Sequence, residues 1–116
     1  MSPTARFING VFTFAGAGLD KPGPLDAATN YTVPSDKRAH FIYLRAGNSS
    51  DELIYLVMLR NGKPLRYFPI GAKASVHVSL AVVEDIFPES KLELQLGAPT
   101  GTRGSVVLDI GLLELD

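Results

Sequence analysis

The segment from Leu53 to Phe68, LIYLVMLRNGKPLRYF, constrains the fold more than any other part of the chain. In it, two apolar runs rich in strand-favouring residues flank the dipeptide Asn61-Gly62. This dipeptide suits a two-residue type I′ turn, in which both central residues need a positive φ angle. The segment therefore predicts an antiparallel β-hairpin in which Arg60 faces Lys63.

The hairpin register also predicts the place of its second strand in the sheet. Continued without interruption, the register pairs Leu59 with Pro64 and Tyr55 with Phe68. Proline has no N–H group to offer a third strand, so we expect the strand that contains Pro64 to lie at a sheet edge.

The hairpin has two apolar faces, because successive side chains of a strand point to opposite sides. A sandwich core normally covers only one face of an antiparallel sheet, so the second face needs another cover. That cover is either another segment of this chain, or a second subunit or an apolar ligand. The residues predicted to bind a partner or ligand are one of these faces and the basic residues near the turn: Ile54, Leu56, Met58, Leu65, Tyr67, Arg60, Lys63 and Arg66.

The rest of the chain contains several more segments with strand-like alternation. With the hairpin, the predicted strands cover residues 6–14, 40–46, 53–60, 63–68, 75–83, 91–96 and 105–115. The Gly- and Pro-rich residues 15–24 predict an irregular loop, and residues 84–88 a single helical turn. This pattern predicts an all-β fold, an antiparallel β-sandwich of about seven strands that is immunoglobulin-like or jelly-roll-like. The 116 residues suit a single domain spanning 1–116.

Composition excludes several classes of function. The chain has no cysteine, which excludes a disulfide framework and thiolate metal sites. A net charge of −1 argues against nucleic-acid binding, and no apolar run is long enough to span a membrane as a helix. We expect no cofactor. Without a signal peptide, a membrane segment or cysteine, the expected location is cytoplasmic.

Charge is unevenly distributed along the chain. Residues 37–73 carry seven basic and two acidic side chains, a net charge of +5, whereas residues 74–116 carry two basic and seven acidic ones, a net charge of −5. We expect these segments to attract each other within one fold rather than between subunits.

Few residues suggest catalysis or metal binding. His40 and His77 lack a second ligand at the spacing of a metal site, so no metal site is predicted. Asp109 lies in an apolar strand and should form an ion pair with Arg45 or Arg66. The basic residues Arg45, Arg60, Lys63 and Arg66 are interpreted as a solvated face in preference to an anion-binding patch.

Three functions follow, in order of preference. The first is non-catalytic association, as a homo-oligomer or as an accessory subunit of a larger complex. The second is a carbohydrate- or small-ligand-binding module that uses loops 46–52 and 98–104 together with the tyrosines. The third is a small enzyme that uses His40 or His77 with Asp109 and a nearby arginine. No pattern in the sequence identifies a reaction, and a non-catalytic function is favoured.

Overall fold

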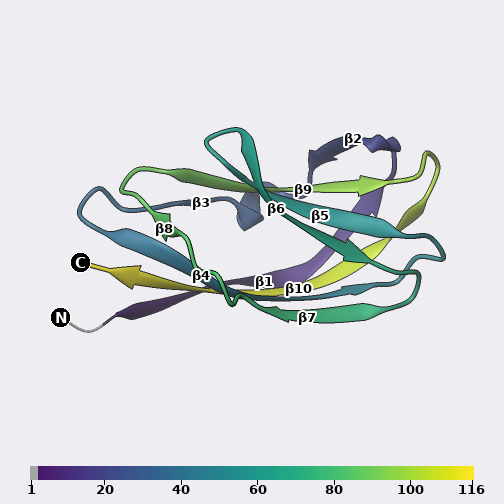
Figure 1. Ribbon diagram of the computed structural model, residues 1–116. Coiled ribbons are helices and arrows are strands. Elements are labelled where there is room, and N and C mark those ends of the chain that lie inside the picture. The colour runs from purple at the N-terminus through teal and green to yellow at the C-terminus, as the bar shows by residue number, and fades with distance from the viewer. Residues whose placement is uncertain (1–2) are drawn as a thin grey trace.

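A computed structural model describes residues 3–116 and shows two antiparallel β-sheets packed face to face (Figure 1). The predicted all-β sandwich is confirmed. The first sheet, sheet A, has the strand order β1-β10-β4-β7, with β8 also paired to β4. Sheet B has the order β2-β9-β5-β6, with β3 also paired to β9. The elements are β1 (Thr4–Ala15), β2 (Gly18–Pro24), the 3-10 helix η1 (Ala27–Thr29), β3 (Tyr31–Thr32), β4 (Arg38–Asn48), β5 (Ile54–Arg60), β6 (Lys63–Ile70), β7 (Ser75–Ser79), β8 (Asp85–Ile86), β9 (Lys91–Ala98) and β10 (Arg103–Leu115).

The core lies between the inner faces of the two sheets. Sheet A contributes Leu44 and Ile110, and sheet B contributes Leu94, all fully buried. Phe41 of β4 meets Phe68 of β6 edge to face across the core, with ring centroids 5.8 Å apart. Alternation of apolar and polar residues along the long strands supplies these inner faces, as the sequence pattern predicts.

The predicted hairpin turn is confirmed. Asn61 and Gly62 have φ angles of 52° and 83°, as a type I′ turn requires, and Arg60 faces Lys63. The strand that contains Pro64, β6, lies at the edge of sheet B, also as predicted.

The predicted register is wrong beyond the first pairs of the hairpin. Leu59 pairs with Pro64 as expected, but the register then shifts by one residue, so that Leu56 rather than Tyr55 faces Phe68. A β-bulge, in which β6 has one residue more than β5, causes this shift. Because side chains alternate, the extra residue turns Phe68 into the core.

Three of the residues predicted to bind a partner are buried inside this chain. Ile54, Leu56 and Met58 are 0%, 0% and 1% exposed because the chain's own second sheet covers them. Leu65 packs against the same core, whereas the bulge leaves Tyr67 on the opposite face with 59% exposure. The apolar inner face of the hairpin is therefore the core of this chain.

The other apolar face of the hairpin is covered largely by neighbouring side chains of its own sheet. Val57 is 1% exposed and lies between Tyr67 and Gln95 on the adjacent strands. Leu59 is 8% exposed, between Pro64 and Glu93. Within β5, this outer face is therefore covered mainly by the chain itself, while Tyr67 of β6 stays exposed.

Three further sequence expectations are corrected. Part of the predicted loop 15–24 forms β2, which pairs irregularly with β9. The predicted turn of helix at 84–88 is instead the short strand β8, where Ile86 pairs with Ala39 and fills the core. The strand predicted over 75–83 ends at Ser79 as β7, and Val82 beyond it is 72% exposed.

The opposite charges of the two chain segments meet within the fold, as predicted. Four ion pairs among residues 3–116 join the basic segment 37–73 to the acidic segment 74–116. They are Lys37–Asp116, Arg38–Asp85, Arg45–Asp109 and Arg60–Glu84.

A buried carboxylate links the two sheets near the termini. Glu114 of β10, with a side chain 2% exposed, accepts a 2.5 Å hydrogen bond from the Tyr31 hydroxyl of β3 and a 3.1 Å bond from Arg6 Nε of β1. Burial raises the pKa of Glu114, but the hydrogen bonds from Tyr31 and Arg6 outweigh it and hold this pKa below 4.5. The charged form of Glu114 therefore stabilises the fold.

We expect acid to destabilise the protein partly through Glu114. Because its folded-state pKa is lowered, its contribution is present above its ordinary pKa of 4.5 and is lost as the pH falls through the folded-state value. Glu114→Gln should lower the free energy of unfolding at neutral pH by about 1–3 kcal/mol and flatten its fall in acid. Urea unfolding from neutral pH downward measures both effects.

The matched control is Asp116→Asn, which removes a more exposed carboxylate that pairs with Lys37. Its unfolding should follow that of the unmodified protein. A Glu114→Gln variant that keeps the full pH dependence would contradict the role assigned to this carboxylate.

Candidate functional site

Four polar side chains form a row across the outer face of sheet A. Asn9 of β1 pairs with Asp109 of β10, Asp109 pairs with Arg45 of β4, and Arg45 pairs with His77 of β7. Their side chains point to the same side, because paired residues of adjacent strands share a face. We call these four residues the polar row.

Less polar residues flank the polar row on both sides. In the same strand order, from β1 to β7, one flanking row is Val11, Val107, Gly47 and Ser75, and the other is Phe7, Gly111, Tyr43 and Ser79. Phe7, Val11 and Val107 are 62%, 67% and 58% exposed. The outer face of sheet A thus has hydrogen-bonding groups between exposed apolar side chains.

The centre of the polar row is held in place by direct contacts. Arg45 Nη2 donates a 2.5 Å hydrogen bond to Asp109 Oδ2, and the Tyr43 hydroxyl lies 3.2 and 3.3 Å from the two Asp109 carboxylate oxygens. The Arg45 guanidinium lies 5.3 Å from the centre of the Tyr43 ring. The hydrogen bond to Asp109 raises the pKa of Arg45, so the arginine keeps its charge.

A glycine allows Tyr43 to adopt this position. The Tyr43 ring lies flat over Gly111 of the neighbouring strand, where an added Cβ atom would approach the ring to 2.1 Å. On its other side the ring meets His77 edge to face, with centroids 6.2 Å apart. Tyr43 therefore connects Asp109 to His77 along the row.

A shallow groove runs beside the polar row. One hollow of about 500 Å³ is lined by Arg45, His77 and Asp109, and a second of about 320 Å³ by Ser49, Lys73 and Ser105. Residues that line both hollows make the groove continuous; they are Gly47, Ser75 and Val107.

Gly47 forms the floor of this groove. A Cβ atom added there would meet only the Ser75 Cβ, at 3.8 Å, which is an ordinary contact. The depth of the groove at this point is therefore set by the missing side chain and not by a strained backbone.

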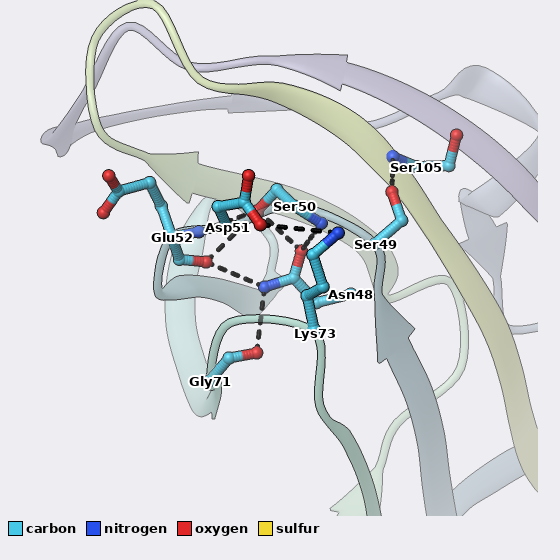
Figure 2. A network of polar contacts seen from close by, with 8 residues as sticks. All are labelled: Asn48, Ser49, Ser50, Asp51, Glu52, Gly71, Lys73 and Ser105. Atoms are coloured by element: carbon cyan, nitrogen blue, oxygen red, sulfur yellow. Dashed lines mark hydrogen bonds and ion pairs between the residues drawn. The ribbon is translucent and has the colours of Figure 1, made fainter.

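Asn48 fixes the end of the groove through a buried hydrogen-bond network (Figure 2). Its Nδ2 lies 2.9 Å from the Glu52 carbonyl oxygen and 3.0 Å from that of Gly71, and its Oδ1 accepts bonds from the backbone N–H and hydroxyl of Ser50. Next to it, Ser49 Oγ accepts a 2.8 Å bond from the Ser105 N–H. The turn after β4 and the connection from β6 to β7 are thus tied together beside the groove.

The structure does not bring the histidines predicted for catalysis into one centre with Asp109. His77 lies two strands from Asp109, about 10 Å away at the usual strand spacing, with Arg45 between them. His40 contacts Asp85 instead, at 3.3 Å. The predicted ion pair of Asp109 with Arg45 is present.

The basic residues considered as an anion patch are divided between two sheets. Arg45 lies on sheet A and pairs with Asp109, while Arg60 lies on β5 and pairs with Glu84 at 3.0 Å. Arg60 and Lys63 line a small hollow of about 230 Å³ at the hairpin turn. Within residues 3–116, no three His, Asp or Glu side chains gather closely enough to hold a metal ion.

The four tyrosines are also separated. Tyr31 is tied to the buried Glu114, and Tyr43 lies in sheet A. Tyr55 and Tyr67 form a pair on the outer face of sheet B, with centroids 5.7 Å apart. The Tyr55 hydroxyl donates a 2.6 Å bond to the Leu19 carbonyl, and its ring covers Gly97. This pair is thus engaged with its own chain on one side.

Sequence reasoning missed Asn9 as a site residue, and it included Gly47 only as part of the loop 46–52. Each lies in a segment predicted as a strand or its end, and neither belongs to a motif. Of the loops predicted to bind ligand, 46–52 does line the groove, through Gly47 and Ser49. Strand alternation in the sequence indicates which side chains point outward. It does not show which strands are neighbours in the sheet, so the row could not be predicted.

Solved structures share this fold. The CBM36-1 domain of a multidomain xylanase from the hindgut metagenome of Trinervitermes trinervoides has a TM-score of 0.58 and 13% identity over 95% of this chain and 96% of that one. A structure of infectious bursal disease virus Gt strain has a TM-score of 0.50 and 12% identity, covering 97% of this chain and 32% of the viral one. At such identity the similarity establishes the fold alone. Neither the protein-family models nor the curated proteins match the chain.

No helix within the described residues 3–116 combines the length and apolar character needed to cross a membrane.

We expect Asn48→Ala to destabilise the protein by about 2–4 kcal/mol, because it leaves several buried backbone and hydroxyl groups without a partner. Chemical denaturation measures this loss. Ser49→Ala, which removes one exposed hydrogen bond from the next residue, is the matched control and should cost less than about 1 kcal/mol. Equal losses for the two variants would contradict the importance given to Asn48.

Proposed function

We propose that this chain is a non-catalytic binding module that holds a carbohydrate on the outer face of sheet A. The observation that carries the proposal is the polar row, which lies beside a groove and between exposed apolar side chains. A sugar ring has hydroxyl groups at its edge and apolar C–H groups on its faces. Asn9, Arg45 and Asp109 supply hydrogen-bonding partners for the hydroxyls, and Val107 supplies apolar contact.

The charges of the groove favour an uncharged ligand. Arg45 is paired with Asp109 at 2.5 Å, and Lys73 lies 3.4 Å from Asp51. Each of these cations therefore has a carboxylate beside it, which reduces its attraction for a phosphate or sulfate. A neutral glycan can still accept hydrogen bonds from the guanidinium and donate to the carboxylate.

Preorganisation also supports this surface. The Arg45 side chain is oriented without a ligand by its hydrogen bond to Asp109 and by the Tyr43 ring beside it. A site that is already ordered loses less conformational entropy on binding. The CBM36-1 domain adds support of a different kind, because that domain, a carbohydrate-binding module by its name, has this fold.

The outer face of sheet B is a weaker candidate surface. Its aromatic pair, Tyr55 and Tyr67, would suit stacking on sugar rings. However, the Tyr55 hydroxyl already donates a hydrogen bond to the Leu19 carbonyl, and the Tyr55 ring packs over Gly97. Tyr67 is thus the matched position for a control variant.

Filling the groove, or removing its central donor, should weaken carbohydrate binding without unfolding the protein. Gly47→Val places a strand-favouring side chain over the groove floor, and Arg45→Ala removes the central donor. Each should weaken binding to the best ligand of a polysaccharide panel by at least about tenfold, or 1.4 kcal/mol. Affinity electrophoresis selects the ligand, and isothermal titration calorimetry measures the dissociation constants.

Tyr67→Ala should bind like the unmodified protein, and thermal unfolding should show that all three variants are folded. Two results would refute the proposal. One is the absence of binding to every polysaccharide tested. The other is loss of binding in Tyr67→Ala together with full binding in Gly47→Val.

A second candidate function is association with another protein, as an accessory subunit. The buried hairpin face no longer supports it, but the connection from β7 to β9 does. In this connection Val82, Val83 and Phe87 are 72%, 40% and 61% exposed. The three residues are close in the sequence, and exposed apolar patches mark contact surfaces in many proteins.

For this second function, tagged protein purified from its native source should bring a partner with it at a constant ratio. The double variant Val82→Ser, Phe87→Ser should lose that partner while keeping its thermal stability. A partner retained by the double variant, or no partner at all, would count against this surface.

A further inference from the structure

We propose that two copies of this chain form a dimer by pairing their β1 strands antiparallel, with a twofold axis at Asn9. Strand β1 lies at the edge of sheet A, where β10 is its only strand partner among the described residues. It has twelve residues, contains no proline, and carries Arg6 as its one charged side chain. Natural proteins usually shorten, charge or cover such an edge, because its free backbone groups pair readily with another strand.

The outward side chains of β1 are arranged symmetrically around Asn9. They are Ala5, Phe7, Asn9, Val11 and Thr13, and none of them is charged. Phe7 and Val11, the large apolar ones, are 62% and 67% exposed and stand two residues before and two residues after Asn9. This spacing makes the strand complementary to itself in the antiparallel direction.

The symmetry and the apolar residues together select one register. A twofold axis perpendicular to the sheet keeps both outer faces on the same side, so outward residues must pair with outward residues. Pairing Asn9 with Asn9 of the second copy places Phe7 opposite the second copy's Val11, and Val11 opposite its Phe7. Aromatic and β-branched residues are favourable cross-strand pairs. A shift of the axis by one residue places Phe7 opposite Asn9 or Thr13 instead.

No like charges face each other in this register. Arg6 falls opposite Phe12 of the second copy, so the two Arg6 residues are separated by six positions, or about 20 Å along the strand. In its own chain Arg6 already pairs with Glu114. Like charges therefore do not meet at the interface.

The interface area predicts a reversible dimer. A strand of twelve residues is about 40 Å long, and a sheet edge with its side chains is about 10 Å high, so roughly 400 Å² would be buried on each copy. The total of roughly 800 Å² lies below the roughly 1,200 Å² at which standard stable interfaces begin. We therefore expect association in the micromolar range, with exchange between monomer and dimer.

The dimer would join the two polar rows end to end. Asn9 is the last residue of the row at the β1 edge, and it would meet its own copy at the axis. The combined row would run from His77 of one copy through both Asn9 amides to His77 of the other. This consequence rests on the proposed function. It implies that the ligand is a polymer long enough to contact both copies.

The absence of cysteine allows a direct test by cross-linking. Paired residues of adjacent antiparallel strands have Cα atoms about 4.5–5.5 Å apart, within the range of a disulfide. Asn9→Cys should therefore form a disulfide-linked dimer under mild oxidation. Phe7→Cys and Val11→Cys should each cross-link poorly alone and efficiently when the two proteins are mixed. Tyr67→Cys, on sheet B, is the control and should remain monomeric on a non-reducing gel.

Sedimentation of the unmodified protein gives an independent measurement. We expect a concentration-dependent monomer–dimer equilibrium, and we expect Val11→Lys to weaken it at least about tenfold. A protein that stays monomeric throughout the micromolar range would overturn the proposal. So would cross-linking of Asn9→Cys no faster than that of Tyr67→Cys.

The two proposals fail separately. A monomer that still binds carbohydrate, with binding weakened at least about tenfold by Gly47→Val, would refute the dimer and keep the proposed function. A dimer with the predicted cross-links that binds no polysaccharide would refute the function and keep the dimer.

Discussion

The structure depends on one buried amide at the point where the chain passes from sheet A to sheet B. Asn48 is the last residue of β4, and it is 4% exposed. Its side chain provides both donors and an acceptor to the turn that leads into β5 and to the connection that leads into β7. Without such a partner, the backbone groups of these turns would be buried unsatisfied, which a core of this size tolerates poorly. At the other end of the sandwich, the charged Glu114 links β1, β3 and β10 in the same manner.

The same amide connects the fold to the proposed binding surface. Gly47 and Ser49, the two neighbours of Asn48 in the chain, both line the groove. The Asn48 backbone N–H also donates a 2.9 Å bond to the Ala74 carbonyl, which positions the strand that carries Ser75 and His77. The groove is therefore built on paired strands and on a turn held by the Asn48 hydrogen bonds. The register of β4 and β10 places Arg45 opposite Asp109. A surface of this kind can bind a ligand with little rearrangement.

Much of the fold was predictable because it depends on local chemistry. The type I′ turn follows from Asn61-Gly62, and the edge position of β6 follows from Pro64. The bulge in β6 was not predictable, because nothing in the sequence around Leu65 marks one extra residue, yet that residue reverses every later side chain of the strand. The burial of Ile54, Leu56 and Met58 in this chain's own core was not predicted, for a related reason. Apolar side chains on both faces of a ribbon indicate burial, but they do not identify the segment that covers them.

The candidate site was predictable only in part. Pairing of Asp109 with an arginine follows from the cost of burying a single charge, and Arg45 was one of the two arginines considered. The polar row itself needs the register of four strands that are distant in the sequence, and local patterns carry no information about it. Gly47 has a role only because Ser75 and Val107 lie on either side of it.

The most direct test of the account is an NMR titration of ¹⁵N-labelled protein with the polysaccharide fragment that it binds best. If the outer face of sheet A is the binding surface, the largest signal shifts will come from the backbone amides of Asn9, Arg45, Gly47 and His77 and from those of β10 around Asp109. Signals that move mainly around Tyr55 and Tyr67, on the outer face of sheet B, would contradict it.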